Sequence, residues 1–122
     1  MTERTLLWTV TDPRGLSISL AADVWAMIVR KHQDMQPYLA AVRQTVESPD
    51  EIYFDAESTQ ARHTGAQMFV YRRDHLLSQA DADKHVLVAV KVLVEDNGER
   101  GYVQTAYASD RVAKRWVSRW KK

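Results

Sequence analysis

The chain has 122 residues, of which 45% are hydrophobic, 27% are charged and none is cysteine, and its formal net charge is +1. This length and composition fit one domain, residues 1–122, with a packed interior. They exclude disulfides and thiolate metal sites, and the small net charge gives no global signal for nucleic acid or membrane.

No segment is typical of membrane insertion or export. The longest apolar stretch, Val86–Val94, is too short to span a bilayer as a helix, and it contains Lys91. No long apolar stretch follows the first residues, Met1–Arg4, so we expect no secretory signal. The sequence therefore predicts a cytoplasmic protein without a membrane partner.

Two strands and a helix are predicted near the N-terminus. Side-chain character alternates over Thr5–Val10 and Leu16–Leu20, and Asp12–Gly15 between them contains the Pro and Gly of a tight turn. These segments predict a short hairpin. Apolar residues at helical spacing then predict a helix over Ala21–Lys31, with Ser19 or Asp23 placed to favour its N-terminal end.

A second helix is predicted after a short turn. Asp34 is the expected N-cap, and Pro37 lies in the first turn, where its missing N–H costs no hydrogen bond. Apolar residues continue at helical spacing from Tyr38 to Val46, and Ser48–Asp50 with its proline ends the helix.

The middle of the chain predicts a sheet. Residues 56–66 and 74–84 are polar and are expected to be loops, and Asn97-Gly98 is a hairpin signal. The expected strands are Glu51–Asp55, Gln67–Arg73, Val86–Val94 and Tyr102–Tyr107.

The C-terminal segment has the spacing of an amphipathic helix. Ser109 or Asp110 is placed to cap it, and Val112, Trp116 and Trp120 recur every four residues. The predicted fold is therefore α+β: two N-terminal helices packed on a four-stranded antiparallel sheet, with a short N-terminal hairpin and a C-terminal helix.

His32 is the histidine best placed for chemistry. It follows the first helix at the turn into the second, where an imidazole can act as a general base near neutral pH. A histidine that only caps helical carbonyls fits the same position. The other histidines, His63, His75 and His85, are far from it in sequence and give no metal-ligand spacing, so we expect no metal or other cofactor.

Strand residues supply candidate phosphate ligands. Lys91 interrupts an apolar strand face, and it either faces a phosphate or extends its ammonium group to solvent. Arg72 and Arg73 lie on opposite faces of their strand, so at most one of them shares a face with a given site. Thr105 and Tyr107 share a face and can hold a phosphate beside a cation, or they can be ordinary strand residues.

The C-terminal residues 110–122 contain six basic residues against one acidic residue. Basic residues interleaved with tryptophan are typical of nucleic-acid binding, although the tryptophans can equally pack on the sheet. The candidate nucleic-acid ligands are Arg72, Arg111, Lys114, Arg115 and Arg119.

Three segments of the chain, and the order in which they occur, resemble the small bacterial and phage-associated domains of the barnase–EndoU–colicin–RelE nuclease superfamily. They are Trp25–Met35 around His32, Glu47–Ile52 with its Pro-Asp-Glu-Ile, and Val103–Tyr107 with its Thr-Ala-Tyr. Val70–Arg73 and Val88–Lys91 resemble the middle strands of that group. The similarity covers roughly residues 16–112.

The resemblance implies RNA cleavage without a metal. As the toxin of a toxin–antitoxin pair, the protein would have a cognate antitoxin as its partner. His32 would be the base or acid, Arg73 or Lys91 the phosphate cation, and Thr105 and Tyr107 hydrogen-bond donors.

The chain departs from the pattern of that group at two places. Met27 stands where the group often has a second histidine, and Gln33 and Asp34 replace a Pro and a Glu. The sequence therefore leaves three hypotheses: a ribonuclease, a non-catalytic RNA- or protein-binding module on the same fold, and a protein-interaction domain of undetermined oligomeric state.

Overall fold

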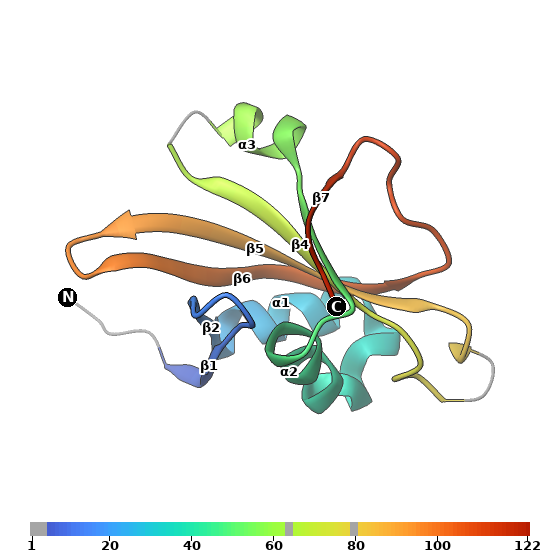
Figure 1. The fold of residues 1–122 in the computed structure, drawn as a ribbon. Coiled ribbons are helices and arrows are strands. Elements are labelled where there is room, and N and C mark those ends of the chain that lie inside the picture. Colours follow the sequence, from blue (N-terminus) through green and yellow to red (C-terminus); the bar gives the residue numbers. More distant parts are fainter. Residues whose placement is uncertain (1–4, 63–64, 79–80) are drawn as a thin grey trace.

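A seven-stranded sheet forms the centre of the molecule in the computed structural model, which describes residues 5–62, 65–78 and 81–122 (Figure 1). In space the strands follow the order β1-β2-β6-β5-β4-β3-β7, and all neighbours are antiparallel except the parallel pair β2 and β6. The strands are β1 (Leu6–Thr11), β2 (Ser17–Ala21), β3 (Glu51–Phe54), β4 (Gln67–Arg73), β5 (His85–Glu95), β6 (Gly98–Ser109) and β7 (Val117–Lys121).

The predicted middle of the sheet is confirmed. Strands β4, β5 and β6 pair as an antiparallel meander, and Gly98 takes a φ of +106° in the hairpin between β5 and β6. Val86, Val88 and Val90 point to one face of β5 and are fully buried, because the helices cover that face. Lys91 lies on the other face and is half-buried, between the buried Val90 and Val92.

The prediction of a four-stranded antiparallel sheet is wrong, because the N-terminal hairpin joins the sheet. β1 and β2 pair as predicted, but β2 also pairs in parallel with β6 from Ser17 to Ser19. Gly101 permits this contact: a Cβ on it would lie 2.9 Å from the Cγ1 atoms of Ile18 and Val90. The strand was expected to begin at Tyr102, so Gly101 was not recognised as a strand glycine at which two backbones approach closely.

Gly101→Ala should destabilise the fold by about 1–3 kcal/mol, because the added methyl group meets two buried branched side chains. Urea denaturation of the variant measures the loss. Val90→Ala removes one of the two clashing methyl groups, so the double variant should be more stable than the sum of the single effects predicts. Strict additivity would contradict the proposed contact.

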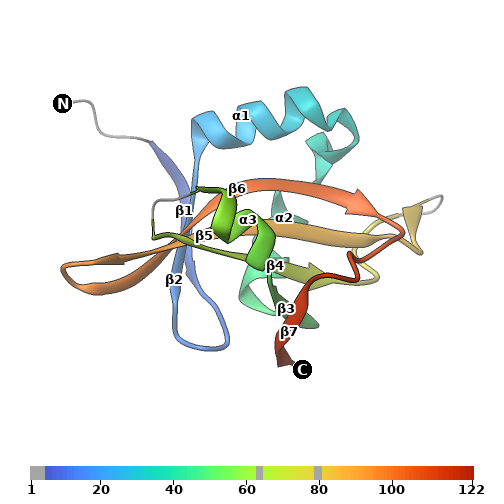
Figure 2. The same cartoon turned by 90° about the horizontal axis from the view of Figure 1, so that it is seen from above.

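The helices lie on both sides of the sheet. α1 (Ala22–Lys31) packs against β6 as predicted, and α2 (Leu39–Glu47) packs against β1, β4 and β5. The second predicted helix begins instead as a 3-10 helix, Gln33–Tyr38, and Asp34 makes no side-chain cap. Figure 2 shows α1 running beside β6 and α3 (Ala56–Arg62) in front of β4 and β5, on the opposite side of the sheet.

Helix α3 occupies a segment that was expected to be a loop. The buried Asp55 carboxylate caps its start by accepting hydrogen bonds from Ser58 N–H at 3.1 Å and Ser58 Oγ at 2.8 Å. The rest of that expected loop includes residues 63–64, which lie outside the described residues, as do residues 1–4 and 79–80.

The predicted C-terminal helix is wrong: residues 117–121 form β7, which pairs antiparallel with β3. Trp116 and Trp120 therefore do not share a helix face. Trp120 packs on the core beneath the helices, and Trp116 packs with Tyr53 on the opposite face of the sheet. Pairing with the open edge of β3 has overridden the helical spacing.

Candidate functional site

A polar hollow of about 260 Å³ opens on the outer face of the sheet, the face away from α1 and α2. We call it the Tyr107 hollow. A bulge in β6 shapes it, because Thr105 pairs with Ala89 and Val103 with Val90, so Gln104 is the extra residue. The hollow is lined by Asp55, Ser58, Met68, Val70, Ala89, Gln104, Thr105, Tyr107, Arg115 and Trp116.

His32 reaches Tyr107 from the end of α1. Its backbone N–H donates to the Ile28 carbonyl at 2.7 Å, which fixes the last turn of the helix. The imidazole stacks on the Tyr107 ring with a centroid distance of 5.7 Å and an interplanar angle of 30°. Three sequence candidates, Thr105, Tyr107 and Arg115, therefore line the hollow, and His32 contacts one of them, Tyr107, without lining the hollow itself.

Arg115 is held by two carboxylates at the edge of the hollow. Its guanidinium lies 3.7 Å from Asp55 Oδ2 and 3.3 Å from Glu57 Oε2. Burial alone would raise the pKa of Asp55, but the hydrogen bonds from Ser58 and the Arg115 charge hold that pKa below its usual value. An anion at this hollow must therefore compete with Asp55 and Glu57 for Arg115.

Tyr107 is a hydrogen-bond donor in this setting. Burial raises the pKa of its phenol, and the charge of Asp55 adds to the rise while Arg115 opposes it. The phenol therefore stays protonated at neutral pH and can donate to an oxygen in the hollow.

The other predicted cations lie elsewhere. Lys91 lines a neighbouring hollow with Leu93, Glu95, Tyr102 and Gln104. Arg73 lies on the helix face of β4, where it donates to the Ser48 carbonyl at 2.8 Å. These two residues therefore do not line the Tyr107 hollow.

Arg72 belongs to a polar network that sequence reasoning missed. It pairs with Glu51 at 3.3 Å and Asp74 at 3.1 Å, and Asp74 also bonds to His85 Nδ1. Burial would raise the pKa of Glu51, but hydrogen bonds from Ser118 and Tyr53 and the charges of Arg72 and Lys121 lower it. The network joins β3, β4 and β5, so Arg72 is bound within the fold.

Burial and the hydrogen bond to Glu51 raise the pKa of Tyr53, in the same network, to about 12. Tyr53 therefore stays protonated and donates to Glu51 at 2.8 Å throughout the neutral range.

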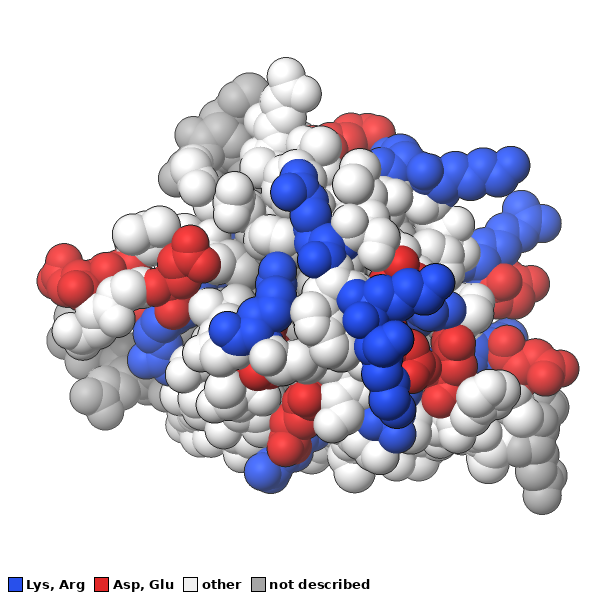
Figure 3. All heavy atoms as spheres, viewed as in Figure 1, with Lys and Arg blue, Asp and Glu red and all other residues white. Residues whose placement is uncertain are grey.

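The basic C-terminal residues form a loop and an edge strand. Arg111, Lys114 and Arg119 are exposed, and in the described part of the chain no carboxylate lies within ion-pair distance of them. The Arg119 guanidinium lies over the Phe54 ring, 4.9 Å from its centroid. Figure 3 shows Lys and Arg side chains gathered in the middle of the face on which β7 ends, with Asp and Glu between them.

Comparisons with known protein families, curated proteins and solved structures find no match to this chain. The resemblance to the nuclease superfamily therefore remains a hypothesis.

Among residues 5–62, 65–78 and 81–122, no three His, Asp or Glu side chains gather as a metal-binding group. No helix in these ranges has the length and apolar character needed to cross a bilayer. His63 lies outside the described residues.

Asp55→Asn should lower stability by about 1 kcal/mol at pH 7, because the carboxylate caps α3 and pairs with Arg115. The native pKa lies below the ordinary value of 3.8, so this stabilisation is present above pH 3.8. It is lost as the pH falls through the lowered native pKa. Urea denaturation at pH 7 and pH 3 should show the difference between the two proteins shrinking at the lower pH; an unchanged difference would contradict it.

Proposed function

We propose that the protein cleaves RNA at the Tyr107 hollow, without a metal ion and slowly. The observation that carries the proposal is the stacking of His32 on Tyr107. It puts an imidazole from the end of α1 beside the hollow that Thr105 and Tyr107 of β6 and Arg115 share. The resemblance to the nuclease superfamily assigns chemistry to three of these four residues.

The residues suit attack by a ribose 2′-hydroxyl. His32 accepts the 2′-hydroxyl proton, the 2′-oxygen forms a bond to phosphorus, and the bond to the 5′-oxygen breaks. Thr105, Tyr107 and Arg115 stabilise the charge on the phosphate oxygens. The products are a 2′,3′-cyclic phosphate and a 5′-hydroxyl.

Two features limit the rate in this scheme. Among the described residues His32 is the one imidazole that contacts a residue of the hollow, so the leaving 5′-oxygen takes its proton from water. Arg115 must also give up part of its contact with Asp55 and Glu57 before it can reach a phosphate. Both features predict a slow enzyme with weak substrate affinity.

Non-catalytic RNA binding is the second candidate function. It is favoured by the basic segment, since Arg111, Lys114 and Arg119 are exposed and have no carboxylate partner among the described residues. Stacked and exposed guanidinium groups are typical of RNA contacts.

One assay separates the two functions. Purified protein is incubated with a single-stranded RNA in EDTA, beside the same strand with 2′-deoxyribose throughout. The proposal predicts 2′,3′-cyclic phosphate ends from the RNA and no cleavage of the deoxy strand. Binding of intact RNA without cleavage, at high protein concentration, would favour the second function. Neither binding nor cleavage would exclude both.

A further inference from the structure

Strand β7 forms one edge of the sheet, and that edge is open. β3 is the one described element that packs closely against β7. Lys122 N–H donates to the Asp50 carbonyl, on the β3 side, at 3.0 Å. Because bonding directions alternate along an antiparallel pair, the N–H and C=O groups of the preceding residue, Lys121, point away from β3. No described residue bonds to them, so this edge presents backbone groups with which a further strand can pair.

The side chains of β7 are as open as its backbone. Val117, Ser118, Arg119 and Lys121 are exposed, whereas Trp120 is partly covered because it packs on the core. Val117 is 52% exposed and offers apolar surface to a neighbour. At the other edge of the sheet, in contrast, α2 packs against β1. The edge that is free to take a partner strand is therefore β7.

The charge along this edge has one sign. Residues 111–122 contain six basic side chains and no acidic one. In the described part of the chain, no carboxylate lies within ion-pair distance of Arg119 or Lys121. Glu51 is opposite Lys121 in the register, but its carboxylate pairs with Arg72 at 3.3 Å. Positive charges on β7 are therefore available to an acidic partner.

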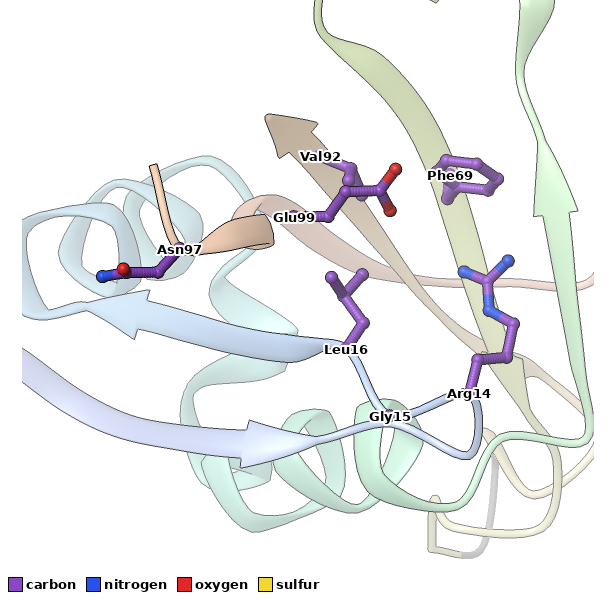
Figure 4. A pocket seen from close by; sticks show the side chains of 7 residues that line it. All are labelled: Arg14, Gly15, Leu16, Phe69, Val92, Asn97 and Glu99. Atoms are coloured by element: carbon purple, nitrogen blue, oxygen red, sulfur yellow. The ribbon is translucent and has the colours of Figure 1, made fainter. Parts of the chain in front are cut away.

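Arg119 is held in place on the helix face of β3. Its guanidinium lies over the Phe54 ring, 4.9 Å from the centroid, and Phe54 packs against Phe69 with a centroid distance of 5.4 Å. Phe69 is contacted in turn by Arg14, beside the pocket that both residues line (Figure 4). A guanidinium positioned by such contacts loses little rotamer entropy when it pairs with a carboxylate.

A second copy of this chain is a poor partner for β7. A parallel pair of β7 strands in register sets Arg119 beside Arg119 and Lys121 beside Lys121. An antiparallel pair centred on the strand sets the two Arg119 side chains opposite each other. Like charges in these positions destabilise a pair of strands. The complementary partner therefore carries acidic side chains.

We infer that β7 binds an extended acidic segment of a partner protein, which joins the sheet as a further strand. The backbone of that segment pairs with the free N–H and C=O groups of Lys121. Its side chains alternate between the two faces of the sheet, so one acidic residue meets Lys121 on the outer face and another meets Arg119 on the helix face. An apolar residue beside the second one packs against Val117.

RNA fits the same edge less well. Its phosphates pair with Arg119 and Lys121, but its backbone has no amide groups to match the row of N–H and C=O groups on β7. A peptide strand satisfies the charges and the backbone groups together. The edge therefore favours an acidic peptide, and RNA is the alternative that the experiment must separate from it.

The test is a titration of the ¹⁵N-labelled full chain with a short blocked peptide that alternates glutamate and valine. The peptide should shift the amides of β7 and should slow the hydrogen exchange of Lys121 N–H. The same peptide methylated at its backbone nitrogens keeps the charge but cannot pair as a strand, so it should bind about tenfold or more weakly. A peptide with lysine in place of glutamate should not bind.

Two variants test the charges. Lys121→Gln and Arg119→Gln should each weaken binding of the acidic peptide by about twofold to fivefold, the range of one cross-strand ion pair. Lys31→Gln is the matched control, because Lys31 is an exposed lysine at the end of α1, away from β7, and should change the affinity little.

Each remaining outcome would overturn the inference. No binding of the acidic peptide at millimolar concentration would mean that the basic side chains only keep β7 from pairing with other edges. Equal affinity for the methylated peptide, or for a single-stranded RNA without slower exchange at Lys121, would identify a general anion surface. The inference does not depend on RNA cleavage: His32→Phe should leave peptide binding unchanged, and Lys121→Gln should leave the cleavage rate unchanged.

Discussion

Replacing His32 with alanine should lower the rate of RNA cleavage by about a hundredfold to ten-thousandfold. The proposed step needs a base near neutral pH, and a positioned imidazole contributes an effect of that size. His32 is half-buried against Tyr107 at the end of α1, so its removal leaves the sheet intact. The measurement is the initial rate of cyclic phosphate formation under single-turnover conditions.

A second variant separates proton transfer from packing. His32→Phe keeps a ring against Tyr107 but cannot exchange a proton, so it should be as inactive as His32→Ala. His75→Asn is the control, because His75 is exposed, does not line the hollow and has a φ of +65° that asparagine tolerates. Activity retained in His32→Phe would show that the imidazole only packs, and the proposed chemistry would then be wrong.

Replacing Asp12 with alanine should lower the free energy of unfolding by about 3 kcal/mol. The carboxylate is buried and accepts hydrogen bonds from Arg14 N–H and Leu16 N–H, both at 2.9 Å, and from the Tyr71 hydroxyl. Its loss leaves two turn N–H groups and a buried hydroxyl without their main acceptor. Urea denaturation followed by circular dichroism measures the change.

Tyr71→Phe tests one arm of the same network. It removes only the hydroxyl donor, and the turn contacts to Asp12 remain, so we expect a smaller loss of about 1.5 kcal/mol. Asp96→Ala, in the exposed hairpin turn between β5 and β6, is the matched control and should change stability little. Equal effects of Asp12→Ala and Asp96→Ala would contradict the role of Asp12 as a buried anchor.

The elements that local sequence determines were predictable. Alternating valines in β5, the Asn97-Gly98 turn and the apolar stripe of α1 each act over a few residues, and the structure confirms all three. The β1–β2 hairpin is confirmed for the same reason, since Pro13 and Gly15 define its turn.

Pairings between distant segments were not predictable in this way. The parallel contact between β2 and β6 depends on the missing side chain of Gly101, and β7 depends on the open edge of β3. Neither leaves a periodic pattern. The regular spacing of Val112, Trp116 and Trp120 even favoured a helix, because tryptophans that pack on opposite faces of a sheet can share a helical spacing by chance.

The candidate site was predictable in part. His32, Thr105 and Tyr107 were selected by residue type and position. In the fold Thr105 and Tyr107 line one hollow, and His32 stacks on Tyr107. The cation was harder, because the resemblance named Arg73 or Lys91 for the phosphate and Arg115 was only one of five candidate nucleic-acid ligands. The fold alone separates Arg115 from Arg72 and Arg73. Asp55 was missed, since an isolated acidic residue looks the same in the sequence whether it caps a helix, lines a pocket or meets solvent.

The strand order also bears on how the chain folds. The β5–β6 hairpin forms by closing one short loop. In contrast, β2 pairs with β6, which is more than eighty residues away, and β7 pairs with the distant β3. Closing a long loop lowers the conformational entropy of the chain before the strand contacts that stabilise it can form. Pairing between distant segments therefore slows folding. We therefore expect the β4–β5–β6 meander to form first, and the flanking strands β1, β2, β3 and β7 to pair with it afterwards.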